Sequence, residues 1–517
     1  MFIGPLIKPA FMKKPVAKKL LPLFLLCSLA SVAQLPAHIE AVAEKHTRVS
    51  FRTFYEMLSL PNDAHFAQDI EKNVRWCEAA FAQRGFSTQR LETATVPLLL
   101  ASRPAKGAKK TVLIYLQIDG QPVDPTKWDQ ESPWEPVLKE KGADGKWKKI
   151  DYNKLYEGYD PEWRIFARAA SDAKGPAAAF IAALDALAEL DEQPNYHLKV
   201  IMDLEEELGS PQLPGAVEKY KDALAADMLL IYDGPRHISN KPTLTFGARG
   251  IAEITLTVHG PRNPTHSGNY GNYTPNPAMR LAQLLATMKD DDGRVTLPGF
   301  YDGVALTQQE KDILKQVPDD ETEVRKFLGI AAPDKIGDNF QESIQYPTLN
   351  IRGMNALYVG KEARTLIPDK AVAEIDIRLV KTGTAERLIG LVRQQVQSKG
   401  YHILDREPTE EERLTIPRIA SFTSKISYGP FQTPFDSAPG VFLTRAMTRV
   451  FGKEPIRIRM MGGSIPISPF VTTLGIPAVS VPTVNPDNNQ HAENENIRVG
   501  NYAEAVRTFL AILLEKL

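Results

Sequence analysis

The chain has 517 residues, with 62 Lys and Arg against 63 Asp and Glu, so its formal net charge is -1. Hydrophobic residues make up 43% and charged residues 24%, a globular composition that excludes a disordered or coiled-coil chain. Near-neutrality gives no global reason to bind nucleic acid. The 2 cysteines exclude a disulfide scaffold and a Cys-rich zinc module, so a metal site must use the 9 histidines and the carboxylates.

The first 33 residues are predicted to be a secretory signal peptide. A basic segment, Met12–Lys19, precedes the apolar run Leu20–Ala33, which ends on the small residues of Ser31-Val32-Ala33. The run is too short to cross a bilayer, and no later stretch reaches the roughly 18 apolar residues of a membrane helix. We therefore expect an exported (periplasmic or secreted) protein that begins at Gln34, with no membrane span in the mature chain.

Four short apolar segments alternate with helical patterns in the two outer parts of the chain. The predicted strands are Lys110–Asp119, His197–Leu204, Met228–Tyr232 and Ala478–Val481. The predicted helices are residues 51–60, 65–85 and 176–192. This alternation predicts an α/β domain with a parallel or mixed sheet that is covered on both faces.

The middle of the chain, residues 243–404, follows a different pattern. Ile251–Val258 and Ala371–Leu379 alternate polar and apolar residues, which favours antiparallel strands with one wet face. Helical patterns over residues 277–288 and 385–399 accompany them. We therefore predict an α+β domain (243–404) inserted into an α/β domain made of residues 34–242 and 405–517.

Acidic residues follow the predicted strands of the α/β domain, where open sheets of this kind bind ligands. Asp119 closes the first strand, Glu205–Glu207 the second and Asp233 the third; Asp172 precedes the Ala-rich helix, and His491 follows the fourth strand. Taken singly, an Asp before a helix is usually an N-cap and a Glu triplet a solvated face. Together these carboxylates would repel one another, and a pair of divalent ions is the simplest way to hold them ionised.

Seven segments carry this chemistry in a recognisable order. They are Gln117–Pro125 with Ser132–Pro136, Ala170–Pro176, Glu205–Ser210, Tyr232-Asp233, His266–Gly271, Gly462–Pro466 and His491–Glu495. In order and spacing they resemble the dinuclear zinc peptidases of metallopeptidase family twenty, which include carnosinase, aminoacylase and glutamate carboxypeptidase. The resemblance covers essentially the whole mature chain. It implies a phosphorylase/hydrolase-like α/β catalytic domain interrupted by a ferredoxin-like lid or dimerisation domain.

The resemblance also implies a role for each residue of the acidic cluster. Asp172 would bridge two zinc ions, Glu207 and His491 would complete one metal site, and Asp233 would belong to the other. Glu206 would be the general base that deprotonates the bridging water and passes the proton to the leaving amine.

Other residues would position groups or bind the substrate. Asp119 would orient the metal ligand two residues before it. His266 would stabilise the tetrahedral oxyanion across a homodimer interface, and the fork of Arg378 would hold the substrate carboxylate. Ser464 and Thr365 are weaker expected contacts.

Gln117 is the one departure from the family's pattern, which has His at this position. An amide oxygen is a neutral and poorer zinc ligand than imidazole. The first metal could therefore be weakly bound, be another divalent ion such as Mn or Co, or be missing in a pseudo-enzyme. The presence of the base Glu206, the bridge Asp172 and the second-site ligands favours an active hydrolase.

The sequence thus predicts an exported metal-dependent exopeptidase or dipeptidase acting on dipeptides or short peptides. Two alternatives remain open: an N-acyl amino acid amidohydrolase and a catalytically silent peptide-binding protein. The chain has no H-E-x-x-H, G-x-S-x-G or P-loop sequence, which argues against zincin, serine-nucleophile and nucleotide chemistry.

Overall fold

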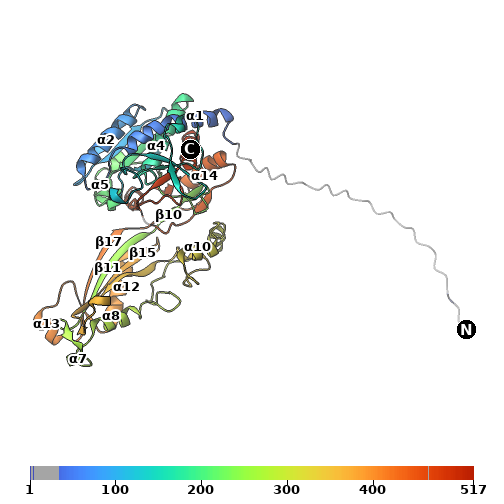
Figure 1. The fold of residues 1–517 in the computed structure, drawn as a ribbon. Helices are drawn as coiled ribbons and strands as arrows, with labels where there is room; N and C mark the ends of the chain where they lie inside the picture. Colours follow the sequence, from blue (N-terminus) through green and yellow to red (C-terminus); the bar gives the residue numbers. More distant parts are fainter. Residues whose placement is uncertain (2–3, 5–33, 464) are drawn as a thin grey trace.

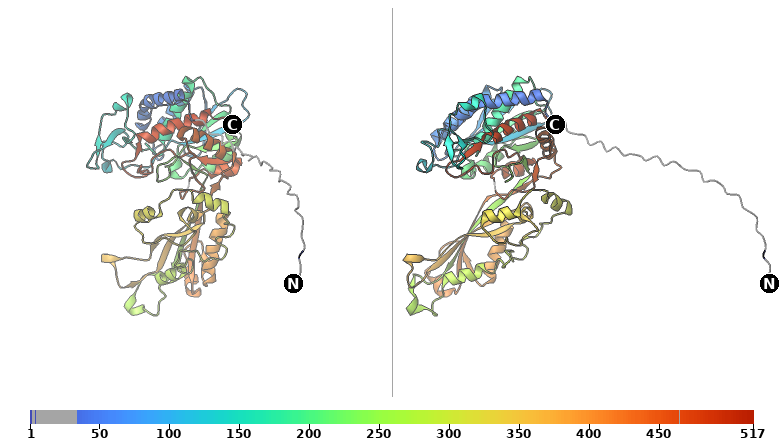
Figure 2. Two further views of the ribbon diagram at one scale, coloured as in Figure 1. Left: turned by 90° about the vertical axis from the view of Figure 1, so that its right-hand side faces the viewer. Right: turned by 45° about the vertical axis from the view of Figure 1, so that its right-hand side comes forward.

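The computed structural model describes Met1, Gly4, residues 34–463 and residues 465–517. Ser464 and nearly all of the predicted signal peptide lie outside these residues, so both predictions stay untested. None of the helices in the described part of the chain is long and apolar enough to cross a membrane. The described chain forms a rounded lobe and an elongated lobe (Figures 1 and 2).

The rounded lobe is built on an eight-stranded sheet in the order β1-β2-β7-β3-β8-β20-β9-β19. Its strands are β1 (Ser87–Leu91), β2 (Leu98–Arg103), β3 (Thr111–Gln117), β7 (His197–Asp203), β8 (Met228–Ile231), β9 (Thr243–Thr245), β19 (Ile456–Ile458) and β20 (Ala478–Ser480). The four central strands, β7, β3, β8 and β20, are parallel, whereas β2 and β9 run antiparallel to their central neighbours. The predicted mixed sheet is confirmed, and all four predicted strands are present.

Helices cover both faces of this sheet, because its central strands are apolar on both sides. One face carries α1 (Ala37–Leu58), α2 (Ala67–Ala82), α4 (Lys174–Glu189), α14 (Ala438–Phe451) and α16 (Val499–Leu514). The other face carries α5 (Leu213–Lys219) and α15 (Ser468–Leu474).

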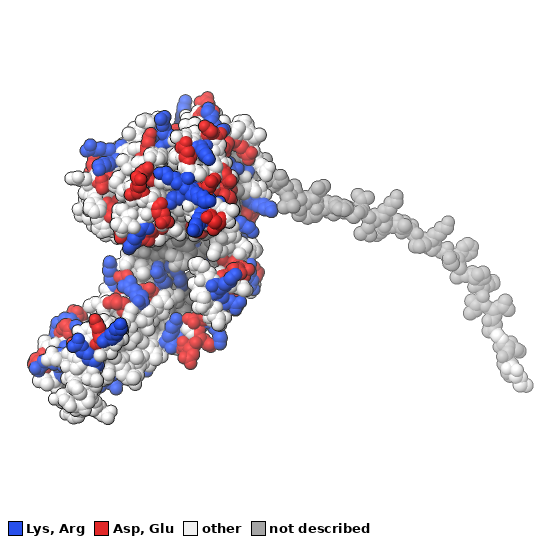
Figure 3. All heavy atoms as spheres, in the orientation of Figure 1, with Lys and Arg blue, Asp and Glu red and all other residues white. Residues whose placement is uncertain are grey.

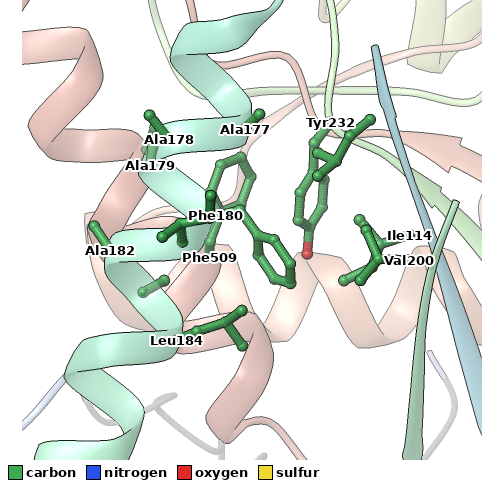
Figure 4. Packing of buried hydrophobic residues seen from close by; sticks show 14 of the residues in the cluster. Ile114, Ala177, Ala178, Ala179, Phe180, Ala182, Leu184, Val200, Tyr232 and Phe509 are labelled. Carbon is green, nitrogen blue, oxygen red and sulfur yellow. The ribbon is translucent and has the colours of Figure 1, made fainter. Parts of the chain in front are cut away.

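The core beneath β8 holds the end of that strand in place (Figure 4). Tyr232, directly after β8, stacks on Phe509 of α16 with ring centroids 4.0 Å apart, and Phe180 of α4 meets Tyr232 edge-on at 5.5 Å. Alanines of α4 pack around these rings, which lets the helix approach closely. Such a well-packed aromatic cluster fixes the backbone immediately before Asp233.

The elongated lobe contains a five-stranded sheet in the order β13-β15-β11-β17-β16. Its strands are β11 (Gly250–His259), β13 (Thr348–Asn355), β15 (Lys370–Leu379), β16 (His402–Leu404) and β17 (Ile419–Tyr428). The helices α8 (Pro277–Leu285) and α12 (Ala385–Ser398) bury its apolar face, and the polar residues of the period-two pattern lie on the opposite face. The predicted α+β fold class of the inserted domain is therefore confirmed.

Short paired strands lie where the chain crosses between the two lobes. β9 belongs to the eight-stranded sheet, and the short strands β10 (Gly247–Ala248) and β18 (Phe431–Gln432) pair beside it. β17, which we had assigned to the second part of the catalytic domain, pairs with β11 along most of its length. The five-stranded sheet consequently runs from Gly250 to Tyr428, because β17 completes it, and the predicted domain bounds of 243–404 stay a prediction.

The segment from residue 304 to 347 ties the two lobes together. It contains α9 (Gln308–Leu314), α10 (Glu321–Leu328) and α11 (Phe340–Ser343). Asp319 lies 2.8 Å from Nε2 of His237, and Glu310 lies 2.8 Å from the guanidinium of Arg459; both partners belong to the rounded lobe. On the face shown in Figure 3, positive and negative side chains are interspersed over both lobes, in keeping with the near-zero net charge.

Candidate metal centre

The carboxyl ends of three adjacent parallel strands bring the predicted acidic residues to one edge of the sheet. Gln117 at the end of β3 is in register with Asp203 at the end of β7, and Tyr115 of β3 with Ile231 of β8. Asp119, the short 3-10 helix Glu206–Leu208 and Asp233 therefore leave the sheet at the same edge.

Asp172, Glu207 and His491 converge in this region. One ligand atom from each lies within 4.8 Å of the others. Nε2 of His491 is 3.0 Å from Oδ2 of Asp172 and 3.4 Å from Oε2 of Glu207, which also accepts a 2.6 Å hydrogen bond from Gln121. An imidazole and two carboxylates at this spacing fit a divalent cation of the zinc type.

Burial and mutual repulsion raise the pKa values of the carboxylates around this group. Burial, followed by the charge of Asp172, raises the pKa of Glu207 to about 8 and that of Asp233 to about 7. Burial and the charges of Asp233 and Asp172 raise the pKa of Glu206 well above its usual range. The hydrogen bond to Asp172 raises the pKa of His491 to about 9. Bound cations would reverse these shifts by compensating the negative charge.

Gln117 provides a separate test of whether a second cation fits. Its side chain is 1% exposed, and neither amide atom has a hydrogen-bond partner among the residues that the structure describes. Leaving such a buried polar group unpaired costs about 1–3 kcal/mol. Gln117 and Asp233 each lie two residues beyond the register pair Tyr115 and Ile231, so both are at the same edge of the sheet. An amide oxygen with Asp233 and Asp172 is a suitable donor set for a hard divalent cation.

Two buried aspartates hold the turn that carries Glu206 and Glu207. Asp119, fully buried, accepts a 3.0 Å hydrogen bond from the backbone N of Glu207. Asp203 accepts hydrogen bonds from the hydroxyls of Tyr115 (3.0 Å) and Ser210 (2.6 Å) and from the backbone N of Glu205 (3.0 Å). Asp203 was missed in the sequence because an acid at the end of a strand resembles any other polar strand terminus.

The predicted residues of the inserted domain lie apart from this cluster. His266 in β12 (Thr265–His266) is exposed and directly precedes α7 (Ser267–Tyr270), at the end of the elongated lobe that points away from the rounded lobe (Figure 1). Thr365 is its neighbour: β12 pairs with β14 (Leu366–Ile367), and Ser267 N donates to Thr365 O at 2.9 Å. Arg378 instead lies near the end of β15 that is closest to the crossing between lobes, in register with Ile251. The roles of these residues stay predictions.

Comparisons with known proteins agree with this arrangement. A family model for the M20 peptidase dimerisation domain matches residues 246–403. The chain is 29% identical over 428 residues to the Beta-Ala-His dipeptidase of Homo sapiens, covering 81% of this chain and 77% of that protein. It is 28% identical over 425 residues to the Cys-Gly metallodipeptidase of Schizosaccharomyces pombe, covering 81% and 82%. The chain thus carries an M20-type peptidase dimerisation domain and is similar to metallodipeptidases over most of its length.

Solved M20 structures share the fold over nearly the whole chain. The crystal structure of an M20 metallo-carboxypeptidase from Sulfolobus solfataricus has a TM-score of 0.72 at 27% identity, covering 90% of this chain and 98% of that one. Human carnosine dipeptidase 1 has a TM-score of 0.70 at 25% identity, covering 93% and 98%. The family resemblance and the fold class inferred from the sequence are thus confirmed, and the relatives named as dipeptidases and metallopeptidases support a hydrolytic metallopeptidase.

The acid–base behaviour of the cluster leads to a first prediction. The folded pKa values of Asp233, Glu207 and His491 all lie above their ordinary values, so the folded state holds these protons more tightly than the unfolded chain. Their stabilising contribution is complete below the ordinary values and is lost as the pH rises through about 7, 8 and 9. Metal-free protein should therefore lose Tm towards pH 9, and the gain in Tm on adding Zn²⁺ should be larger at high than at low pH. A metal-induced gain that does not depend on pH would contradict this.

Proposed function

We propose that the protein is a metal-dependent dipeptidase that hydrolyses the amide bond of dipeptides or short peptides. The observation that carries the proposal is the convergence of the ligand atoms of Asp172, Glu207 and His491 to within 4.8 Å of one another, next to the half-buried Glu206. The relatives named as dipeptidases support the choice of substrate class.

Two divalent cations, of which zinc is the natural candidate, would occupy the centre. Asp172, Glu207 and His491 would hold one, and Gln117, Asp172 and Asp233 the other. When bound, such ions polarise the scissile carbonyl and make a nearby water more acidic. Because the second set contains only oxygen donors, we propose that it binds zinc weakly and accepts a harder ion such as Mn²⁺ more readily.

Glu206 would act as the general base. Burial among other acids gives its carboxylate a high proton affinity, which suits a group that takes a proton from the attacking water and delivers it to the leaving amine. The backbone around it is fixed by the contacts of Asp119 and Asp203, so its position does not depend on the substrate.

The substrate contacts would come from the inserted domain. Arg378 can bind a free carboxylate with its planar fork, which would explain a preference for the C-terminal end of a small peptide. His266 sits on the far end of its own subunit, and a homodimer formed through the dimerisation domain would bring it to the partner's centre. Thr365, held beside His266, would accompany it.

Two other functions use the same geometry. An N-acyl amino acid amidohydrolase would need the same base, cations and carboxylate contact, and parallel assays of dipeptides and N-acetyl amino acids separate the two. A silent peptide-binding protein is favoured only by Gln117, and it would bind dipeptides without turnover under any divalent ion.

Replacing the base gives the direct test. Glu206→Gln should reduce kcat for dipeptide hydrolysis by about 10²–10⁴-fold, because the proton acceptor is lost. Its metal content, measured by mass spectrometry, should be unchanged, and loss of metal would mean that Glu206 is a ligand. Glu205→Gln is the matched control, since Glu205 bonds to Thr95 and should matter little for kcat.

The same variant tests the cross-subunit arrangement. Mixed dimers of Glu206→Gln and His266→Ala subunits contain one centre with both an intact base and an intact partner histidine. They should regain activity that neither parent has, and mixtures as inactive as the parents would count against the arrangement.

Gln117→His tests the unequal metal sites. Imidazole is a better zinc ligand than an amide, so the variant should bind close to a second equivalent of Zn²⁺ in calorimetric titration. The unsubstituted protein should bind one Zn²⁺ tightly and take Mn²⁺ at the other position, seen by electron paramagnetic resonance. Identical titrations of the two proteins would place Gln117 outside the metal centre.

We also propose export, on the strength of the basic segment Met12–Lys19 and the apolar run after it. N-terminal sequencing of the protein made in a secreting host should then begin at Gln34, whereas an uncleaved chain would refute the signal peptide.

A further inference from the structure

Glu495 is a fully buried carboxylate that accepts five hydrogen bonds. Four come from one short loop: the backbone N of Ala169 (3.0 Å), Ser171 (2.9 Å) and Asp172 (2.9 Å), and the hydroxyl of Ser171 (2.8 Å). The fifth comes from the guanidinium of Arg168 at 2.8 Å. Few side chains can satisfy so many converging donors, since only an ionised carboxylate offers about four acceptor positions and no proton.

The loop is shaped around this carboxylate. It follows β6 (Arg164–Phe166), and its Ala169 has the left-handed φ of 60°, which turns successive N–H groups towards a single point. Glu495 itself directly precedes β21 (Asn496–Arg498), which pairs antiparallel with β6. The carboxylate and the loop that surrounds it are thus held by the same pair of strands.

This arrangement joins two ligands that are distant in the sequence. The backbone N of Asp172 donates a hydrogen bond to Glu495, and His491 lies four residues before Glu495 in the same segment. Both belong to the group whose ligand atoms lie within 4.8 Å of one another. Whatever fixes Glu495 against the loop therefore also fixes the spacing between the Asp172 carboxylate and the His491 imidazole.

Arg168 makes the buried charge of Glu495 tolerable. Its side chain is 3% exposed, its backbone N donates to Pro133 O at 2.9 Å, and its guanidinium lies 5.4 Å over the Trp128 ring. A buried acid that is paired with an arginine and saturated with hydrogen bonds does not need a cation. Glu495 can therefore act on the metal centre without being one of its ligands.

We propose that Glu495 is a positioning residue for the metal centre, holding Asp172 and His491 at the separation that a cation requires before the cation arrives. The inference rests on the proposed metal-dependent function. Its energetic basis is preorganisation: when the ligands are already in position, ordering them costs little free energy on binding.

The test compares metal affinity with folding in three variants. Glu495→Gln replaces one carboxylate oxygen with an amide NH₂ group, which cannot accept hydrogen bonds from the N–H groups of the loop. The variant should bind Mn²⁺ about 10–100-fold more weakly than the metal-free unsubstituted protein, as is usual when a group that supports metal ligands is lost. Ser171→Ala removes one of the five hydrogen bonds and should give a smaller loss. Glu342→Gln is the control, because the Glu342 carboxylate is also buried and accepts a backbone N–H, that of Asp338 (3.2 Å), but in the inserted domain.

Calorimetric Mn²⁺ titration and the absorption spectrum of the Co²⁺ form report on the site, and circular dichroism on the fold. The proposal expects weaker binding and an altered Co²⁺ spectrum in the first two variants and neither change in Glu342→Gln. Unchanged affinity in Glu495→Gln would overturn it. If that variant does not fold, Ser171→Ala decides, and unchanged affinity there would overturn it. If Glu495→Gln and Ser171→Ala bind metal more weakly as expected, but the unsubstituted protein hydrolyses no dipeptide, the proposed function is refuted and this inference stands.

Discussion

The metal centre depends on concentrating negative charge at one partly buried edge of the sheet. Burial raises the pKa values of Glu206, Glu207 and Asp233, and the negative charge of Asp172 raises all three further. The fold brings these acids together because parallel strands end at the same edge of the sheet. It holds the turn in place because Asp119 and Asp203 accept hydrogen bonds from the turn's backbone N–H groups. The structure thus stores electrostatic repulsion that only protons or cations relieve.

Much of this was readable in the sequence, for a definite physical reason. Apolar runs such as Thr111–Gln117 and the alternation of Lys370–Leu379 are local signals of strands. The acids directly follow strands, so they lie at the edge of the sheet where those strands end. β17 was not recognised, because its exposed half, towards Tyr428, is mixed in polarity and its identity as a strand comes from pairing with β11. The place of β17 in the sheet of the inserted domain could therefore not be predicted from the sequence.

The supporting residues were harder to find than the ligands. Glu495 bonds to backbone N–H groups that lie more than 300 residues earlier in the chain, and backbone donors leave no mark on the sequence. Gln117 was visible as an unusual residue, but only the structure reveals that its amide is buried with both polar atoms unsatisfied among the described residues. Metal ligands and catalytic side chains can be recognised in a sequence by their residue type. Side chains that bond to backbone N–H groups can be recognised only in the folded structure.

The two crossings between the lobes lie side by side. Gly247 is paired with Gln432 on one side of the junction and Ile251 with Tyr428 on the other, so the entry and exit of the inserted domain are neighbouring strands, about 5 Å apart. To the catalytic domain, an insertion of well over a hundred residues is equivalent to a hairpin loop, and it adds little to the entropy of closing that chain. The two lobes can therefore share one polypeptide through a single pair of neighbouring strands, and the ion pairs made by residues 304–347 hold the inserted lobe against the domain that carries the carboxylates.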